Sequence, residues 1–236
     1  MLFKVTDEHG QTKGHDGTVY QWGPFIWNEA ASSKARGEWV EEGIFVYDAE
    51  LIAAFFAPLI FVKPKLWSAR GEVISSDKHF GVLCRGLTTL SELPLPVITP
   101  IQRTHFAILS ALSVYESGRF IAWADAWLKG TDRSAEAARV TAEMELTDAP
   151  EDLLRKGRWR MPWLNAALSA CAAAQALHDV SAHVGDELSE RRSQLTGTKQ
   201  AHTERVVTTS WHAALHAKAC KTLDFADLIK RSTQLA

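Results

Sequence analysis

One short stretch of the sequence has the residue types best suited to binding: cationic side chains and indole rings close to a proline. Its side chains belong to Arg155, Lys156, Arg158, Trp159, Arg160 and Trp163. Such a segment can hold phosphates while an indole stacks on a nucleobase. It can equally bind an acidic protein surface, because Trp and Arg are favoured anchors of protein interfaces. A third interpretation is structural, with the cations complementing a helix dipole and the indoles filling the core between helices.

The overall charge helps to choose between these interpretations. The 236 residues carry 26 Lys and Arg against 28 Asp and Glu, a formal charge of −2. A chain whose main task is to coat nucleic acid would be far more basic. Residues 151–236 are mildly basic, with 12 cationic and 9 acidic side chains, so nucleic-acid binding through this region remains the alternative. We expect the basic-aromatic segment to bind a protein partner.

His212, His216 and Cys220 are spaced four residues apart on one predicted helix. Histidine and cysteine are zinc ligands, and two histidines four residues apart can share an ion. A stripe with this spacing drifts by about 80° between its ends, so three side chains meet one ion only with distortion. The other interpretation is a helix face packed against its neighbours. We therefore expect no metal and no cofactor, and this stripe is the candidate to test.

A second histidine group, His178 with Asp179 and His183, has residue types that suit a general base and its orienting carboxylate. Adjacent residues on a helix point about 100° apart, so His178 and Asp179 do not pair with each other. The sequence contains no GxSxG elbow, P-loop or GxGxxG motif. We predict that the protein is not an enzyme, with a histidine-dependent activity through His178 or His212 as the alternative.

The elements that position these residues differ between the two parts of the chain. Residues 1–97 contain nine of the 14 glycines and several short β-forming segments between turn residues. The predicted strands are Leu2–Thr6, Thr18–Trp22, Glu42–Tyr47, Lys65–Ser75 and Val82–Leu90. One helix interrupts them, with Asp48 as its N-cap and Pro58 at its end. We expect the tryptophans of this domain to fill its core, among them Trp22, Trp27 and Trp39.

The chain after residue 97 has helical patterning almost throughout. Thr99 and Gln102 fit a capping box with Pro100 at the first helical position, and apolar spacing continues toward Gly118. Further predicted helices cover Phe120–Lys129, 133–146, Pro150–Gly157, Pro162–Leu195, Gln200–Leu223 and a last short segment from Asp224. Seven alanines within residues 166–176 let helices approach closely, inside one bundle or between the subunits of an oligomer. We expect an α+β protein: a Trp-rich, mostly antiparallel β domain over residues 1–97 and a helical bundle over residues 98–236.

The number of cysteines and the length of the apolar stretches indicate in which cellular compartment the protein works. Cys84, Cys171 and Cys220 are odd in number and far apart, which favours free thiols in a reducing cytoplasm over a secreted disulfide scaffold. The N-terminus has no apolar run of signal-peptide length. The most apolar stretch, Leu51–Val62, is shorter than the roughly 20 residues that a membrane-spanning helix needs. We expect a cytoplasmic protein without a membrane partner.

Several short motifs carry a resemblance that covers roughly residues 1–145. They are Phe3–Thr6, Tyr20–Gly23, Lys65–Trp67, Gly71–Val73, Leu93–Arg103, Ala122–Leu128 and Gly130–Ala135. Together with the Ala-rich helical region that follows, they resemble a family of uncharacterised proteins that phages and prophages encode, known only as a domain of unknown function. The family supplies no catalytic residues to transfer to this chain.

The resemblance implies an accessory gene of a bacterial virus. Small phage accessory proteins often bind and disable a host complex, including restriction and CRISPR machinery, which is an argument by analogy. We therefore expect a non-enzymatic protein that binds and inhibits a bacterial host complex, such as a defence system, in the cytoplasm of the host cell. Its contacts would centre on the basic-aromatic segment and on exposed parts of the β domain.

Overall fold

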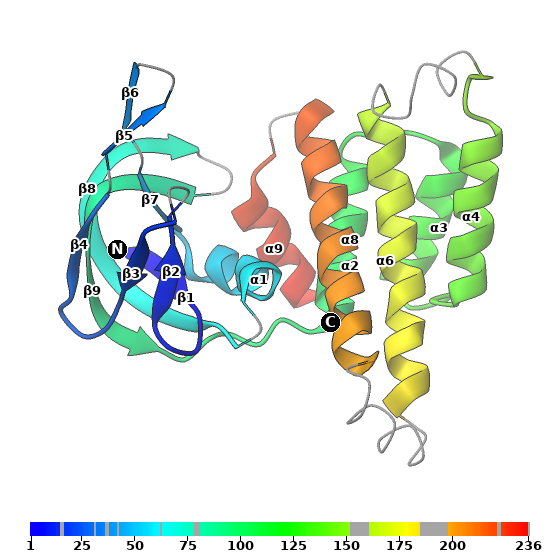
Figure 1. Cartoon of the computed structure of the whole chain (residues 1–236). Coiled ribbons are helices and arrows are strands. Elements are labelled where there is room, and N and C mark those ends of the chain that lie inside the picture. The colour runs from blue at the N-terminus through cyan, green and yellow to red at the C-terminus, as the bar shows by residue number, and fades with distance from the viewer. Residues whose placement is uncertain are drawn as a thin grey trace. The chain divides into compact units, whose positions relative to one another are not determined.

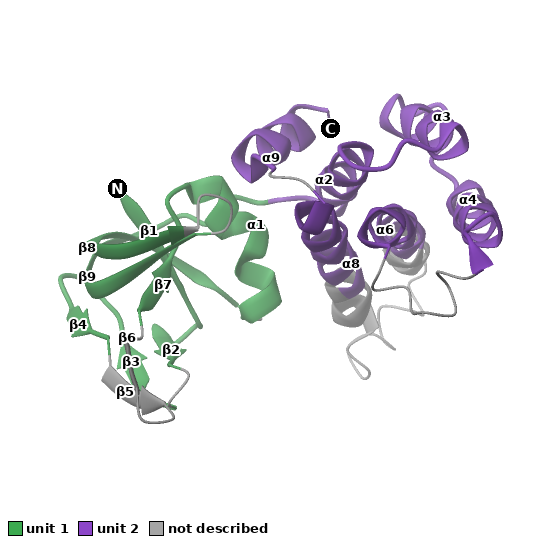
Figure 2. Cartoon of the chain, turned by 90° about the horizontal axis from the view of Figure 1, so that it is seen from above, with its two compact units in different colours: residues 1–97 green, residues 98–236 purple. Residues whose placement is uncertain are grey.

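The computed structural model describes residues 1–14, 17–30, 32–35, 38–41, 43–61, 63–77, 81–151, 161–184, 198–220 and 223–235. The chain divides into two compact units, Met1–Val97 and Ile98–Ala236, coloured separately in Figure 2. Antiparallel strands and one helix make up the first unit, whereas the described part of the second unit is helical (Figure 1). The predicted α+β fold is thus confirmed.

A long, strongly curved hairpin is the framework of the first unit (Figure 1). Strand β8 pairs with β9, β1 adds to the other edge of β8, and β4 and β7 both pair with β9, all of them antiparallel. Three register shifts in the β8–β9 pairing act as bulges, which bend a sheet and increase its twist. The strands of this sheet are β1 (Leu2–Thr6), β4 (Trp27–Glu29), β7 (Ile44–Val46), β8 (Lys65–Asp77) and β9 (Gly81–Leu93).

Two smaller hairpins and one helix complete the unit. The hairpins are β2 (Gln11–Lys13) with β3 (Val19–Gln21), and β5 (Ser32–Ala35) with β6 (Glu38–Glu41). The helix is α1 (Glu50–Ile60), and its bounds correct two expectations. Its N-cap is Ala49 rather than Asp48, and it continues through Pro58. A proline in the last turn removes only one hydrogen bond, and its fixed φ suits a helix, so the helix ends two residues later.

The second unit is built from helices whose starts follow local sequence signals. The helices are α2 (Pro100–Leu112), α3 (Gly118–Leu128), α4 (Ala135–Thr147), α6 (Pro162–Val184), α8 (Thr198–Cys220) and α9 (Phe225–Gln234). Thr99 Oγ1 accepts from the Gln102 amide at 3.2 Å, and the Gln102 side chain accepts from the Thr99 amide at 2.8 Å. The predicted capping box is therefore confirmed. Helix α2 ends at Leu112, however, and Gly118 starts the next helix instead of ending this one.

Close packing of α2, α6 and α8 forms the centre of this unit, and α4 and α9 flank it (Figure 2). The two most closely packed helices, α6 and α8, carry alanines that are almost completely buried: Ala166, Ala167, Ala170, Ala173, Ala174 and Ala176 on α6, with Ala213, Ala214 and Ala217 on α8. Small side chains allow two helix backbones to approach closely. Across the described ranges, no helix is both long enough and apolar enough to cross a membrane.

Candidate interaction site

The predicted basic-aromatic segment lies mostly outside the described residues. Arg155, Lys156, Arg158, Trp159 and Arg160 all belong to the undescribed range 152–160. Trp163 is described: it lies in the first turn of α6 and is 39% exposed. The role of this segment, and with it the nucleic-acid alternative, stays a prediction.

The histidine–cysteine stripe on α8 is fully described. The rings of His212 and His216 lie 6.4 Å apart between centroids, and Cys220 Sγ donates to the backbone carbonyl of His216 at 3.5 Å. Burial lowers the pKa of His216, and the neighbouring His212 lowers it further. Among the residues that the structure describes, no three His, Cys, Asp or Glu side chains form a group that could hold a metal ion.

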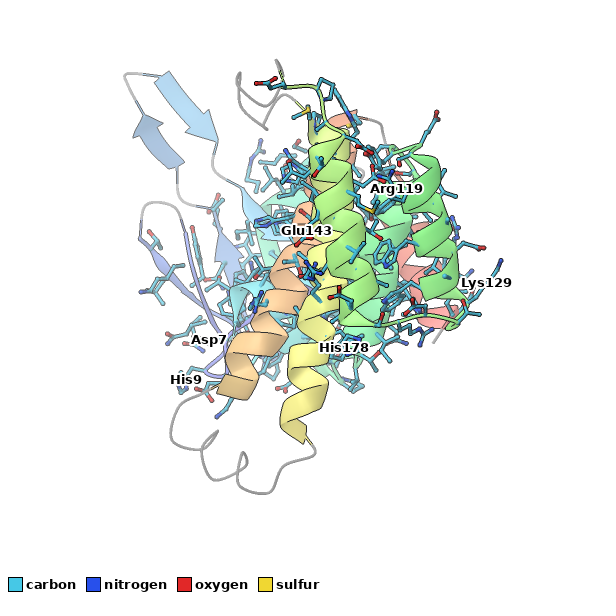
Figure 3. The ribbon with its side chains drawn as sticks, turned by 90° about the vertical axis from the view of Figure 1, so that its right-hand side faces the viewer. Asp7, His9, Arg119, Lys129, Glu143 and His178 are labelled. Atoms are coloured by element: carbon cyan, nitrogen blue, oxygen red, sulfur yellow. The ribbon has the colours of Figure 1, made fainter. Side chains whose placement is uncertain are left out.

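The other predicted histidine, His178, contacts backbone rather than a carboxylate. On α6 (Figure 3), its Nε2 donates to the main-chain carbonyl oxygen of Arg133, in the loop before α4. This contact ties α6 to the segment between α3 and α4. The side chains of Asp179 and His183 lie outside the described ones. His178 therefore has a structural contact, which connects α6 to the loop before α4.

A buried histidine that the sequence did not single out lies in α2. His105 is fully buried, with Nδ1 3.3 Å from the carbonyl oxygen of Ser232 and Nε2 3.4 Å from an Arg133 nitrogen. The Arg133 guanidinium also lies over the Trp127 ring at 4.9 Å, and its Nε donates to the Trp127 carbonyl at 3.0 Å. Burial, more than the nearby guanidinium, lowers the pKa of His105. The cluster connects α2, α3 and α9.

A second buried polar cluster has a carboxylate at its centre. Glu145 of α4 is almost completely buried and accepts from Tyr115 Oη and from Ser117 Oγ, each at 2.6 Å. Two charge-assisted hydrogen bonds of this length satisfy both carboxylate oxygens. Burial and the adjacent carboxylate raise the pKa of Tyr115. Both partners of Glu145 come from the α2–α3 connection, so this cluster too holds helices in place.

The tryptophans of the first unit differ in where they lie. Trp22 is 2% exposed and donates from Nε1 to Thr12 Oγ1 at 2.8 Å, so its expected core position is confirmed. Trp27 is 54% exposed, and the expectation that it fills the core is wrong. Its ring covers the backbone of Gly86 on β9, where any Cβ would collide with the indole. Trp39 lies in β6, whose side chains are outside the described ones.

Phe25 lies two residues before Trp27 and is even more exposed, at 78%. It occupies the third position of a turn that the Ile26 amide closes by donating to the Gly23 carbonyl at 3.3 Å. With Pro24 second and a φ of 59° at Phe25, the turn has the features of type II. That position normally takes Gly or Asn, because a Cβ in the left-handed region costs roughly 1–2 kcal/mol.

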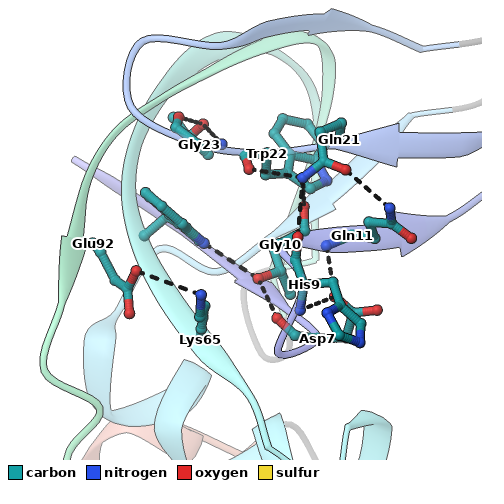
Figure 4. A network of polar contacts seen from close by, with 12 residues as sticks. Asp7, His9, Gly10, Gln11, Gln21, Trp22, Gly23, Lys65 and Glu92 are labelled. Atoms are coloured by element: carbon teal, nitrogen blue, oxygen red, sulfur yellow. Dashed lines mark hydrogen bonds and ion pairs between the residues drawn. The ribbon is translucent and has the colours of Figure 1, made fainter.

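Hydrogen bonds from β9 brace this turn. Thr89 Oγ1 donates to the Gly23 carbonyl at 2.6 Å, and the Thr89 amide donates to the Ile26 carbonyl at 3.1 Å. The segment before the turn is fixed as well: the Trp22 amide donates to the Gly10 carbonyl at 2.7 Å, and Gln21 bonds to the same Gly10 turn (Figure 4). Gly10 has a φ of 73°, and a Cβ there would lie 2.8 Å from the Trp22 carbonyl oxygen. These hydrogen bonds therefore hold the Gly23–Ile26 turn, and with it the left-handed conformation of Phe25, in place.

Phe25 and Trp27 are exposed aromatic residues only two positions apart, and we call the pair the Phe25–Trp27 surface. Nearby on the sheet, Arg85 of β9 and Glu72 of β8 form an exposed ion pair at 2.9 Å. Aromatic side chains with polar neighbours are the usual composition of a protein interface, where a few aromatic anchors supply most of the binding energy. This surface was not predicted from the sequence, because its distinguishing feature is the left-handed backbone conformation of Phe25, which the residue type does not indicate.

Comparison of the chain with protein-family models, with curated proteins and with solved structures finds no match. Function is therefore argued from the geometry of the chain itself. The chemistry that this geometry offers is binding: one exposed ring on a braced turn and a second on the strand that follows it, in a unit of antiparallel strands.

Proposed function

We propose that the protein is a phage-encoded, non-enzymatic interaction protein that binds and inhibits a bacterial host complex, such as a defence system. The observation that supports this proposal best is the Phe25–Trp27 surface. An aromatic side chain buries about 150–250 Å² when a partner covers it, which makes it a strong anchor. The origin of the gene and the kind of target come from the resemblance of the sequence motifs to phage proteins.

Conformational strain supports a binding role for Phe25. Folding of the turn does not need an aromatic ring, since glycine would adopt the same φ without the steric cost. Strained residues that the surrounding structure holds in place concentrate at functional sites. A rigid anchor also loses little conformational entropy when it binds, so more of its contact energy appears as affinity.

The test compares the wild type with a double variant, Phe25→Gly with Trp27→Thr. Each protein is expressed in a bacterium with an active defence system, and the plating efficiency of a targeted phage is measured. We expect the wild type to restore plaques and the double variant to lose this effect. The matched control is Val19→Thr, which removes an exposed apolar side chain elsewhere in the same unit and should behave like the wild type.

Affinity purification from the same cells gives the second readout. A host complex that copurifies with the wild type and with Val19→Thr, but not with the double variant, supports the proposal. Equal recovery of that complex with all three proteins would assign binding to another surface, and the basic-aromatic segment at 155–163 would then be the next to alter. A wild-type protein that leaves plating unchanged in every defended strain would contradict inhibition.

A further inference from the structure

A lysine lies in the interior of the first unit. Lys4, in the middle of β1, is 7% exposed even though lysine is rarely buried without a charged partner. Its Nζ donates to the Phe45 carbonyl oxygen at 2.8 Å and lies 5.2 Å from the centroid of the Trp22 ring. Both contacts suit a cation, yet neither supplies a negative charge. None of the described carboxylates forms an ion pair with Lys4.

Two cavities open beside this ammonium group. Their volumes are about 370 and 470 Å³, in the range that small-molecule sites occupy. Lys4, Thr12, Lys13 and Phe45 line both of them. Lys4 is therefore at a wall that the two cavities share.

The larger cavity differs from the smaller one in charge. Its described lining contains two cations, Lys4 and Lys13, and no carboxylate. Apolar side chains make up much of the rest, including those of Ile44, Phe45 and Leu83. The smaller cavity includes Asp7, whose Oδ1 already accepts from the amides of His9 and Gln11. An anion with an apolar body is complementary to the larger cavity.

Burying the charge of Lys4 costs folding free energy, which suggests that the residue serves binding. Burial lowers its pKa to about 8, partly offset by Cys84, so the amine is still mostly protonated at neutral pH. A buried charge without an opposite charge destabilises the folded state, and an apolar residue of similar volume usually does better. Residues that reduce stability in this way are typical of functional sites.

We propose that the larger cavity binds a small organic anion, with a carboxylate on the ammonium groups of Lys4 and Lys13 and an apolar body against Ile44, Phe45 and Leu83. The bound carboxylate supplies the negative charge that none of the described side chains places beside Lys4. This site is separate from the Phe25–Trp27 surface, and its existence does not depend on the proposed interaction with a host complex.

The probe is octanoate, with octan-1-ol as its neutral counterpart, and affinity is measured by isothermal titration calorimetry on the full chain. We expect octanoate to bind more tightly than octan-1-ol. Lys4→Met should weaken octanoate binding about tenfold or more, because a hydrogen bond to a charged group is lost. The variant should melt no lower than the wild type, since it removes a buried charge. Lys13→Met should weaken octanoate binding by a smaller factor, because Lys13 is exposed.

The control is Lys65→Met, which removes an equal charge from a lysine that is near Glu92 and lines neither cavity. It should bind octanoate like the wild type. Three results would overturn the proposal: no octanoate binding at millimolar concentration, equal affinity for octanoate and octan-1-ol, or unchanged octanoate affinity in Lys4→Met. A loss of affinity in Lys65→Met equal to that in Lys4→Met would also overturn it, because the effect would then be general electrostatics.

Discussion

The two units differ in how they place their aromatic side chains, as one tryptophan from each unit illustrates. Trp127 of α3 is fully buried, with a guanidinium over its ring and the ring of His105 edge-on at 5.2 Å. Trp27 of β4 covers a glycine with one part of its ring and exposes more than half of its surface. Trp127 thus helps to join the helices of its unit, whereas Trp27 lies where a partner can reach it.

Buried polar groups show the same contrast. In the helical unit, Glu145 and His105 contact side chains and carbonyls of neighbouring helices, which fixes the packing. In the β unit, Lys4 contacts one carbonyl and an indole face and lies beside two cavities. Among the described residues, this contrast favours the β unit for the proposed recognition, whereas the described polar clusters of the helical unit hold helices together.

The largest effect should separate the two tryptophans. We expect Trp127→Ala to lower the free energy of unfolding of the helical unit by about 3–5 kcal/mol, because it leaves a large cavity. Trp27→Ala should change the stability of the β unit by less than about 1 kcal/mol, as substitutions at exposed positions usually do. Urea denaturation followed by circular dichroism measures both. Similar losses from the two substitutions would remove the distinction.

The next effect concerns two glutamates on the same helix. Glu145→Ala leaves the hydroxyls of Tyr115 and Ser117 without their acceptor, and we expect a loss of about 1–3 kcal/mol. The control is Glu143→Ala, which removes an exposed ion pair with Arg139 and should cost under about 1 kcal/mol. The same denaturation assay measures both variants. A larger loss of unfolding free energy in Glu143→Ala than in Glu145→Ala would show that the buried Glu145 cluster does not stabilise the packing of the helices.

Acidification should destabilise the helical unit through His105. Because burial lowers the pKa of His105 in the folded state, the unfolded chain binds more protons as the pH falls below the ordinary histidine value of about 6.5. The stability contribution is therefore complete above that pH and is lost toward the lower, folded-state pKa. Urea midpoints at pH 7.5 and 5.5 should differ less in His105→Gln than in the wild type.

His216 contributes in the same direction, because its pKa is lowered too, so some pH dependence should persist in His105→Gln. His212→Gln tests this second contribution, because it removes one of the two causes that lower the pKa of His216. An identical pH dependence in the wild type and in His105→Gln would show that His105 is not the group responsible.

The smallest effect tests the strain at Phe25. We expect Phe25→Gly to stabilise the β unit by about 0.5–1 kcal/mol, since the relief of a left-handed phenylalanine exceeds the entropy cost of a glycine. The melting temperature of the variant should rise slightly above that of the wild type. A fall in melting temperature would mean that the ring stabilises the fold, and the argument for a binding role would lose its basis.

The elements that the sequence predicts well are those with local signals. Thr99 and Gln102 specify the start of α2 through a capping box, and the Asp224 side chain caps α9 by accepting from the Asp227 amide. Strands β2 and β4 were not expected, because they contain Lys13, Asn28 and Glu29, which are residue types that strands contain rarely. Residue type alone placed Trp22 correctly and Trp27 wrongly, because only the tertiary pairing with β9 decides which indole covers Gly86.

The candidate sites were harder still to predict. The preference of phenylalanine for negative φ argues against a left-handed turn at residue 25, and the hydrogen bonds from Thr89 that overcome this preference come from a strand more than 60 residues away. Lys4 appears in the sequence as one polar residue in a short strand, where exposure would be normal. Its burial depends on Trp22 and Phe45, which reach it only through folding.

The distribution of the three thiols has a practical consequence for labelling. Cys84 and Cys171 are buried, so a thiol reagent in solution does not reach either of them. Cys220, at the end of α8, is exposed. A maleimide dye should therefore modify the folded wild-type chain once, in the helical unit. The cavities and the exposed rings of the β unit would stay chemically untouched, so a fluorescent protein for binding measurements can be prepared without any mutation.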